Sequence, residues 1–174
     1  MMNETLRTLT ERRSCRSYRQ EQIRDEELQT VLNAGMYAPS AMGKQRTRII
    51  ALQNADDIRK LSAMNAAVMN GDSDPFYGAP TVIIVLAENE SRTGREDGSL
   101  VLGNMMNAAY SIGLGSCWIN RAYEEFETEE GKALLEKWGV GTGWTGVGHC
   151  ILGYPEGELG EAAPRKKDFV TIVR

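Results

Sequence analysis

The run Thr81–Ala87 constrains the fold more than any other feature of the sequence, because every residue after the threonine is aliphatic. A continuous apolar run of this length fits a β-strand that is covered on both faces. It falls far short of the ~20 residues that a membrane-spanning helix needs. We therefore expect a buried strand and no interaction with a membrane.

The rest of the chain alternates between helical and extended patterns, without repeats or an interdomain linker. A single domain over residues 1–174, with 41% hydrophobic residues, is long enough to form a core without disulfides. The order of the segments predicts an α+β or α/β fold. The expected helices are Glu4–Glu11 (Leu6 and Leu9 inward), a helix from Asp25 that ends at Ala38–Ser40, Asp56–Met69, Asp97–Ile112 and Glu124–Trp138; the expected strands are Arg48–Leu52, Thr81–Ala87, Ser116–Ile119 and Val147–Leu152.

Two segments predict contact with a second copy of the chain. The helix expected at Asp97–Ile112 is weakly charged on all sides, which is typical of a helix in a core or at a subunit interface. The tail Val170–Val173 has the pattern of a short strand, yet it has no partner close in the sequence.

Charge, cysteine and histidine content argue against several function classes. The formal net charge of −4 disfavours nonspecific binding to nucleic acid. The three cysteines (Cys15, Cys117 and Cys150) are far apart and the only histidine is His149, so we expect no metal site. Scattered thiols and an N-terminus without an apolar signal sequence indicate a cytoplasmic protein. His149 and Cys150 lie in an apolar run and are predicted to be core residues.

The segment Glu11–Tyr18 carries the clearest chemical signal. Arg12, Arg13 and Arg16 surround Ser14, and guanidinium groups match the geometry of phosphate and carboxylate groups. The tail holds a second basic cluster, Arg165–Lys167. Two interpretations remain open: both clusters close on one anion, or both are solvated surface charges.

Two glycine-rich strings have competing interpretations. Gly141–Gly146 matches G-x-G-x-x-G, but a helix is expected before it and a strand after it, the reverse of the dinucleotide-binding order. We expect a flexible connection there. Gly113–Gly115 either ends the preceding helix or lets the backbone approach a ligand closely.

Taken in order, these motifs resemble the nitroreductase family of FMN-dependent oxidoreductases over nearly the whole chain. Arg12, Arg13, Ser14 and Arg16 match the first family signature. Pro39, Ser40 and Gln45 match the second, although Gly43 stands where the family has asparagine. Further parts of the chain also match the family. They are the segment Phe76–Pro80 before the apolar strand, the helix expected at Asp97–Ile112, the turn and strand Gly113–Ile119, and the C-terminal segments Gly153–Pro155 and Pro164–Lys166.

The resemblance implies an α+β fold with three α/β/α layers, a mainly antiparallel central sheet, and a domain-swapped homodimer with FMN at the interface. Arg12 and Ser14 would hold the FMN phosphate beside Arg13, and Arg16 would lie near the pyrimidine edge. The backbone of Asn120 and Arg121 would face flavin N5 and O4. Arg165 and Lys167 or Lys166 would also contact the phosphate. The other subunit would contribute Pro39, Ser40, Ala41 and Gly43. Because Gly43 lacks the side-chain amide of the family's asparagine, Asn65 or Asn70 is a candidate to replace it.

The resemblance also implies the reaction. NADH or NADPH would deliver hydride, and a small electron-poor acceptor such as a nitroaromatic or a quinone would take the electrons from the same slot, by a ping-pong mechanism. Two alternatives remain open. One is a related flavin reaction, reductive dehalogenation or flavin destruction, and the other is a flavin- or nucleotide-binding module without turnover.

Overall fold

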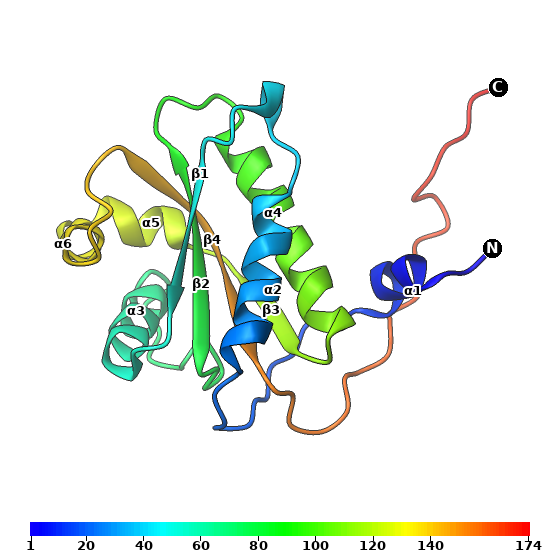
Figure 1. Ribbon diagram of the computed structural model, residues 1–174, viewed down its shortest axis with the longest axis horizontal. Helices are drawn as coiled ribbons and strands as arrows, with labels where there is room; N and C mark the ends of the chain where they lie inside the picture. The colour runs from blue at the N-terminus through cyan, green and yellow to red at the C-terminus, as the bar shows by residue number, and fades with distance from the viewer.

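Four strands form one antiparallel sheet in the computed structural model, which describes residues 1–174 (Figure 1). The strands are β1 (Thr47–Leu52), β2 (Thr81–Glu88), β3 (Gly115–Ile119) and β4 (Trp144–Gly153), in the spatial order β1-β2-β4-β3. The helices are α1 (Glu4–Glu11), α2 (Asp25–Met36), the short η1 (Ala41–Gly43), α3 (Ala55–Ala67), α4 (Gly94–Ser111), α5 (Ala122–Glu127) and α6 (Glu129–Lys137).

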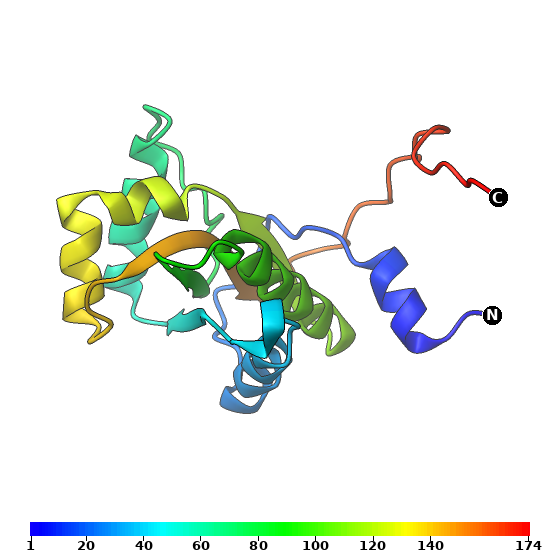
Figure 2. The same ribbon diagram turned by 90° about the horizontal axis from the view of Figure 1, so that it is seen from above.

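The sheet is covered on both faces, as the apolar run predicted. Residues Thr81–Ala87 of β2 are all buried, and their side chains alternate between two cores. Ile83 and Val85 pack with α2 and α4, whereas Ile84 and Leu86 pack with α3, α5 and α6. Figure 2 shows these two helical layers on either side of the sheet. The α+β fold with an antiparallel central sheet is therefore confirmed.

Two expectations about helices are wrong. Leu6 and Leu9 are exposed rather than inward, because α1 projects from the body beside the C-terminal tail and buries no residue (Figures 1 and 2). The helix expected at Glu124–Trp138 is two helices. Thr128 adopts an extended conformation between them, and its hydroxyl accepts a hydrogen bond from the Gly131 amide at 2.9 Å. A threonine in this role ends one helix and caps the next.

None of the helices combines the length and the apolar character that crossing a membrane requires. Residues 138–143 connect α6 to β4, and β4 begins within the Gly141–Gly146 string, at Trp144. The predicted order of helix, loop and strand is therefore confirmed.

A buried carboxylate fixes the start of α2. Glu27 accepts hydrogen bonds from the Arg24 backbone N–H at 2.9 Å, from Arg24 Nη2 at 2.6 Å and from the Tyr154 hydroxyl at 2.6 Å. These bonds, those from Arg24 above all, lower the pKa of Glu27 from 4.5 to about 2. Glu27 thereby ties α2 to the chain that leaves β4.

We expect this carboxylate to make stability depend on pH. Its depressed pKa stabilises the folded state fully above pH 4.5, and this contribution is lost as the pH falls toward about 2. Glu27→Gln has no charge to titrate, so its melting temperature should fall less steeply between pH 5 and pH 2.5. Thermal unfolding followed by circular dichroism measures both slopes, and parallel curves would contradict the assignment.

Candidate functional site

The basic segment after α1 runs along the open edge of β3. Ser14 forms a parallel bridge with Ser116, and the Cys15 amide donates to the Ser116 carbonyl at 2.9 Å. Cys15 is buried, and its carbonyl accepts a hydrogen bond from the buried Tyr18 hydroxyl at 2.8 Å. The core thus anchors Cys15 and turns its exposed neighbours Ser14 and Arg16 outward.

The glycines that precede β3 have structural roles. Gly113 has a φ of +84° at the end of α4, where glycine is favoured. A Cβ on Gly115 would lie 2.7 Å from Cys15 Sγ, so only glycine lets the basic segment pack this closely. The interpretation of Gly113–Gly115 as a helix end is confirmed, and at Gly115 the backbone approaches Cys15 closely.

Three buried donors in and beside this segment have no hydrogen-bond partner: Arg12 Nη1, Arg13 Nε and Ser116 Oγ. Leaving a buried donor unpaired costs about 1–3 kcal/mol. Arg13 also donates through Nη1 to the Thr10 and Arg12 carbonyls, which closes the C-terminus of α1. The β3 edge therefore lacks an acceptor, and guanidinium groups are suited to an anionic one.

Asn120 and Arg121 lie at the far end of β3. Arg121 has a φ of +79°, a left-handed conformation that is unusual for a residue with a side chain, and its Nε is buried without a partner. The Asn120 carbonyl accepts a hydrogen bond from Asn65 Nδ2 at 2.8 Å. Asn65 is fully buried, whereas Asn70 is exposed in the turn after α3, so only Asn65 reaches this end of the edge.

The loop Pro39–Gly43 lies elsewhere in the chain. The Ala41 amide donates to Asp97 Oδ1 in the first turn of α4 at 3.0 Å, and Ser40 Oγ accepts from the Gln45 amide. Gly43 has a φ of +65° and no atom near the position of a Cβ. The eighteen residues of α4 rise about 27 Å. The Arg12–Ser14 segment packs beyond the other end of this helix, so one chain does not bring the two groups together.

The cations Arg165, Lys166 and Lys167 are exposed on the projecting tail (Figure 1). No hydrogen bond or salt bridge joins them to the Arg12–Arg16 segment. A single chain therefore presents three separate groups of predicted site residues: the β3 edge, the loop Pro39–Gly43 and the tail.

The predictions for the late strand are confirmed. His149 and Cys150 are both fully buried in β4, and burial raises the pKa of the Cys150 thiol to about 12. The partner of His149 is Glu125, at 2.6 Å. No pattern in the sequence predicted this contact, because the two residues are 24 positions apart.

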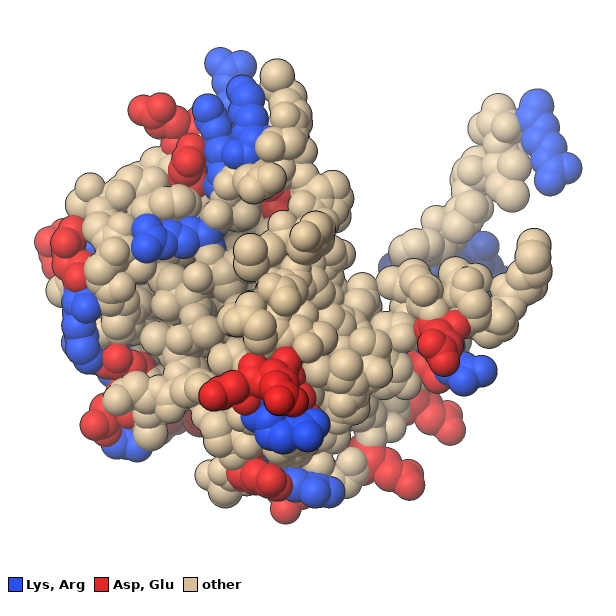
Figure 3. Space-filling view, in the orientation of Figure 1, with Lys and Arg blue, Asp and Glu red and all other residues tan.

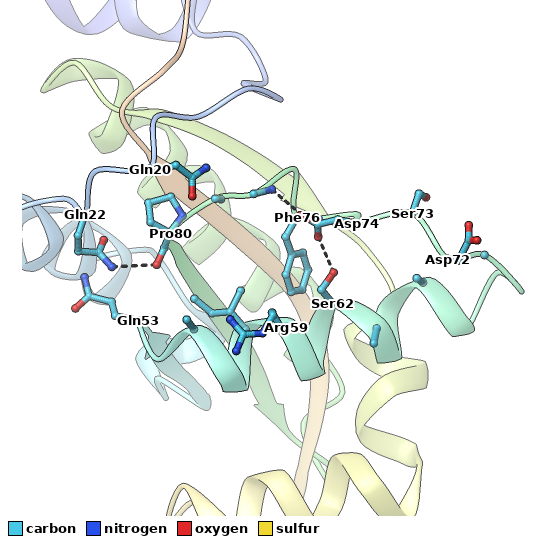
Figure 4. Close-up of a pocket in the computed structure, with 17 residues that line it drawn as sticks. Gln20, Gln22, Gln53, Arg59, Ser62, Asp72, Ser73, Asp74, Phe76 and Pro80 are labelled. Carbon is cyan, nitrogen blue, oxygen red and sulfur yellow. Dashed lines mark hydrogen bonds between the residues drawn. The ribbon is translucent and has the colours of Figure 1, made fainter.

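A cavity lined by α3 lies away from the predicted site. It has a volume of about 850 Å³ and lies between α3 and the segment Asp72–Pro80, with Phe76 in its wall (Figure 4). None of the predicted site residues lines it. A cavity of about 380 Å³ does reach the site, since Asn120 lines it together with Tyr123 and the start of α4.

Known proteins resemble this chain over most of its length. The sequence model described as "Nitroreductase family" matches residues 9–74 and 65–154. A provisionally named NADH dehydrogenase/NAD(P)H nitroreductase of Archaeoglobus fulgidus is 31% identical over 160 residues, 90% of this chain and 88% of the relative. An FMN reductase [NAD(P)H] of Bacillus subtilis is 25% identical over 66% of this chain and 53% of its own length. The crystal structure of a nitroreductase with bound FMN from Bacteroides fragilis superposes with a TM-score of 0.92, at 32% identity, over 99% of this chain and all of the other.

Proposed function

The chain belongs to the nitroreductase family, and from this we propose that it is an FMN-dependent oxidoreductase that passes electrons from NADH or NADPH to electron-poor acceptors such as nitroaromatics or quinones. The observation that carries the proposal is the set of unpartnered buried donors along β3, in a fold whose relatives bind FMN. Bound FMN would accept hydride and release the electrons to the next occupant of the same slot. The residues of the chain would bind FMN, orient it and stabilise the charge of its reduced form.

The residues of the β3 edge fit FMN. Arg12 Nη1 and the exposed Ser14 hydroxyl would donate to the phosphate, with Arg13 Nε beside them. Asn120 and Arg121 would face the flavin ring from the far end of the strand. The strand from Ser116 to Asn120 spans about 13 Å, which leaves room for an extended ligand between the two ends. The tail cations Arg165, Lys166 and Lys167 would then complete the phosphate site.

The visible spectrum and an anaerobic titration test the proposal together. We expect the purified protein to carry flavin absorption bands, and we expect NADH or NADPH to bleach them rapidly. A bound flavin that neither nicotinamide bleaches would indicate a binding module without turnover. A protein that neither carries nor takes up FMN would overturn the proposal.

We further propose a homodimer with two shared sites, in which Pro39, Ser40, Ala41 and Gly43 of each chain reach the flavin of the other. Exposed apolar side chains mark the surface that the second chain would cover: Leu6, Leu9, Leu100, Ile112, Phe169, Val170, Ile172 and Val173. Figure 3 shows a broad uncharged surface over α4 and a hollow between the body and the projecting termini. The reduced state of the three buried cysteines suits a cytoplasmic location.

Sedimentation tests the dimer. We expect twice the mass of the chain at micromolar concentration, because exposed apolar surface of this extent favours association. Removing residues 169–174 should shift the equilibrium toward the monomer. A stable monomer that retains FMN would contradict the shared site.

Arg16 is expected to tune the reduction potential. Reduction places negative charge near the pyrimidine edge, and a fixed guanidinium stabilises that charge more than the uncharged oxidised ring. Arg16→Gln should retain FMN but lower its two-electron midpoint potential by tens of millivolts, where 30 mV corresponds to about 1.4 kcal/mol. Spectroelectrochemistry measures the shift. If the loaded variant has an unchanged potential and binds FMN more weakly, Arg16 is a phosphate ligand.

A further inference from the structure

A polar pair lies in the deepest part of the core between the sheet and α5. The side chains of Glu125 and His149 are both fully buried, and Glu125 Oε2 lies 2.6 Å from His149 Nε2. Phe76 meets the imidazole edge-on at a centroid distance of 5.4 Å, and Phe126 lies 6.4 Å away. Glu125 Oε1 and His149 Nδ1 have no partner. The proposed reaction does not use either residue.

Stability alone does not explain such a pair. Removing two polar groups from water is costly, and well-packed apolar residues in their place are often as stable or more stable. A hydrogen bond, however, fixes direction in a way that apolar packing does not. The pair joins α5 to the middle of β4, and α5 has only six residues, which is too short for an isolated helix.

The pair is connected directly to the strained residue at the end of β3. The Glu125 backbone N–H donates to the Arg121 carbonyl at 3.0 Å, so the side chain that holds His149 and the amide that holds Arg121 belong to one residue. Left-handed backbone at a residue with a side chain persists only where its surroundings hold it. Asn65 holds the preceding carbonyl, that of Asn120.

We propose that the Glu125–His149 pair is a positioning element that holds Arg121 in its left-handed conformation and thereby fixes the Asn120–Arg121 backbone for cofactor binding. The second half of this statement rests on the proposed function. The first half concerns the flavin-free chain alone. His149 is held in the sheet, and its hydrogen bond positions the Glu125 side chain. The Glu125 backbone N–H in turn holds the Arg121 carbonyl.

Amide hydrogen exchange of the flavin-free protein tests the first half. In Glu125→Leu/His149→Phe both polar groups are replaced by apolar ones, so no unpaired polar group of this pair is left in the core. We expect a folded protein whose amides between residues 121 and 125 exchange at least tenfold faster than in the unaltered chain. Glu125→Gln retains a hydrogen bond to His149 and should exchange nearly as slowly as the unaltered chain. If the double variant does not fold, Glu125→Gln decides the test. Its amides between residues 121 and 125 should then still exchange slowly, and exchange at the rate of an unstructured peptide would overturn the proposal.

Asp57→Asn is the matched control, because it weakens a different ion pair, with Lys137, that joins α3 to α6. It should leave exchange at residues 121–125 unchanged. A folded double variant with unchanged exchange at these residues would overturn the proposal.

FMN titration of the same variants tests the second half. We expect roughly tenfold weaker binding in the double variant and near-normal binding in Glu125→Gln. Faster exchange with unchanged FMN affinity would confine the pair to a structural role and overturn the positioning of the cofactor site. An unaltered protein that does not bind FMN would refute the proposed function, and the exchange result would still decide what holds Arg121.

Discussion

Arg12→Ala is expected to bind FMN roughly ten- to a hundred-fold more weakly than the unaltered protein. Arg12 Nη1 is buried beside the β3 edge and has no partner within the chain. A hydrogen bond from a guanidinium to a phosphate contributes about 1.5–3 kcal/mol, which corresponds to this range of affinity. Fluorescence titration of the flavin-free protein measures it directly, because binding at this edge changes the surroundings of the flavin.

Arg19→Ala is the matched control for that measurement. Arg19 lies in the same basic stretch and is exposed, but only its backbone is held, by a hydrogen bond to the Tyr154 carbonyl. Its replacement should leave FMN affinity unchanged. If Arg12→Ala and Arg19→Ala have the same affinity as the unaltered protein, the phosphate lies elsewhere and the assignment of the β3 edge is wrong.

Gly146→Ala is expected to destabilise the fold strongly. Gly146 lies in β4 where the start of α5 crosses the strand, and an added Cβ would lie 2.1 Å from the Ala122 carbonyl oxygen. Backbone cannot rotate away as a flexible side chain can, so α5 has to shift. Overpacking of this kind costs about 1–3 kcal/mol or more. For a chain of this length, the melting temperature should fall by roughly 2–12 °C.

Gly71→Ala provides the comparison. Gly71 is exposed after α3, and the nearest atom to an added Cβ is 3.6 Å away, an ordinary van der Waals distance. Its melting temperature should stay close to that of the unaltered protein. Equal melting temperatures for the two variants would show that α5 moves freely over β4, contrary to the packing described above.

The sequence predicted the parts of the fold that local patterns determine. The strand Thr81–Ala87 and the helix around Asp97–Ile112 follow from runs and periodicity that the structure confirms within a few residues. The prediction that Leu6 and Leu9 point inward was wrong. A helical period shows which residues share a face, but it does not show whether that face contacts the core. The break at Thr128 was missed because a threonine is also tolerated inside a helix.

The chemistry of the candidate site could be predicted better than its geometry. The residue types at Arg12–Arg16 point to an anion, and the structure adds buried donors that lack an acceptor. The choice between Asn65 and Asn70 needed the burial of each side chain. The Glu125–His149 pair and the left-handed Arg121 depend on how α5 docks on β4, and no local pattern in the sequence encodes that contact.

The length of α4 separates the Arg12–Ser14 segment from the loop Pro39–Gly43. This separation determines how mutations in the two groups combine in a dimer. In the proposed dimer, each flavin pocket is encoded half by one molecule and half by the other. A chain damaged at Arg12 and a chain damaged at Ser40 would therefore complement one another. Mixed dimers of the two would contain one intact pocket and one with both defects, whereas each damaged chain alone would form no intact pocket.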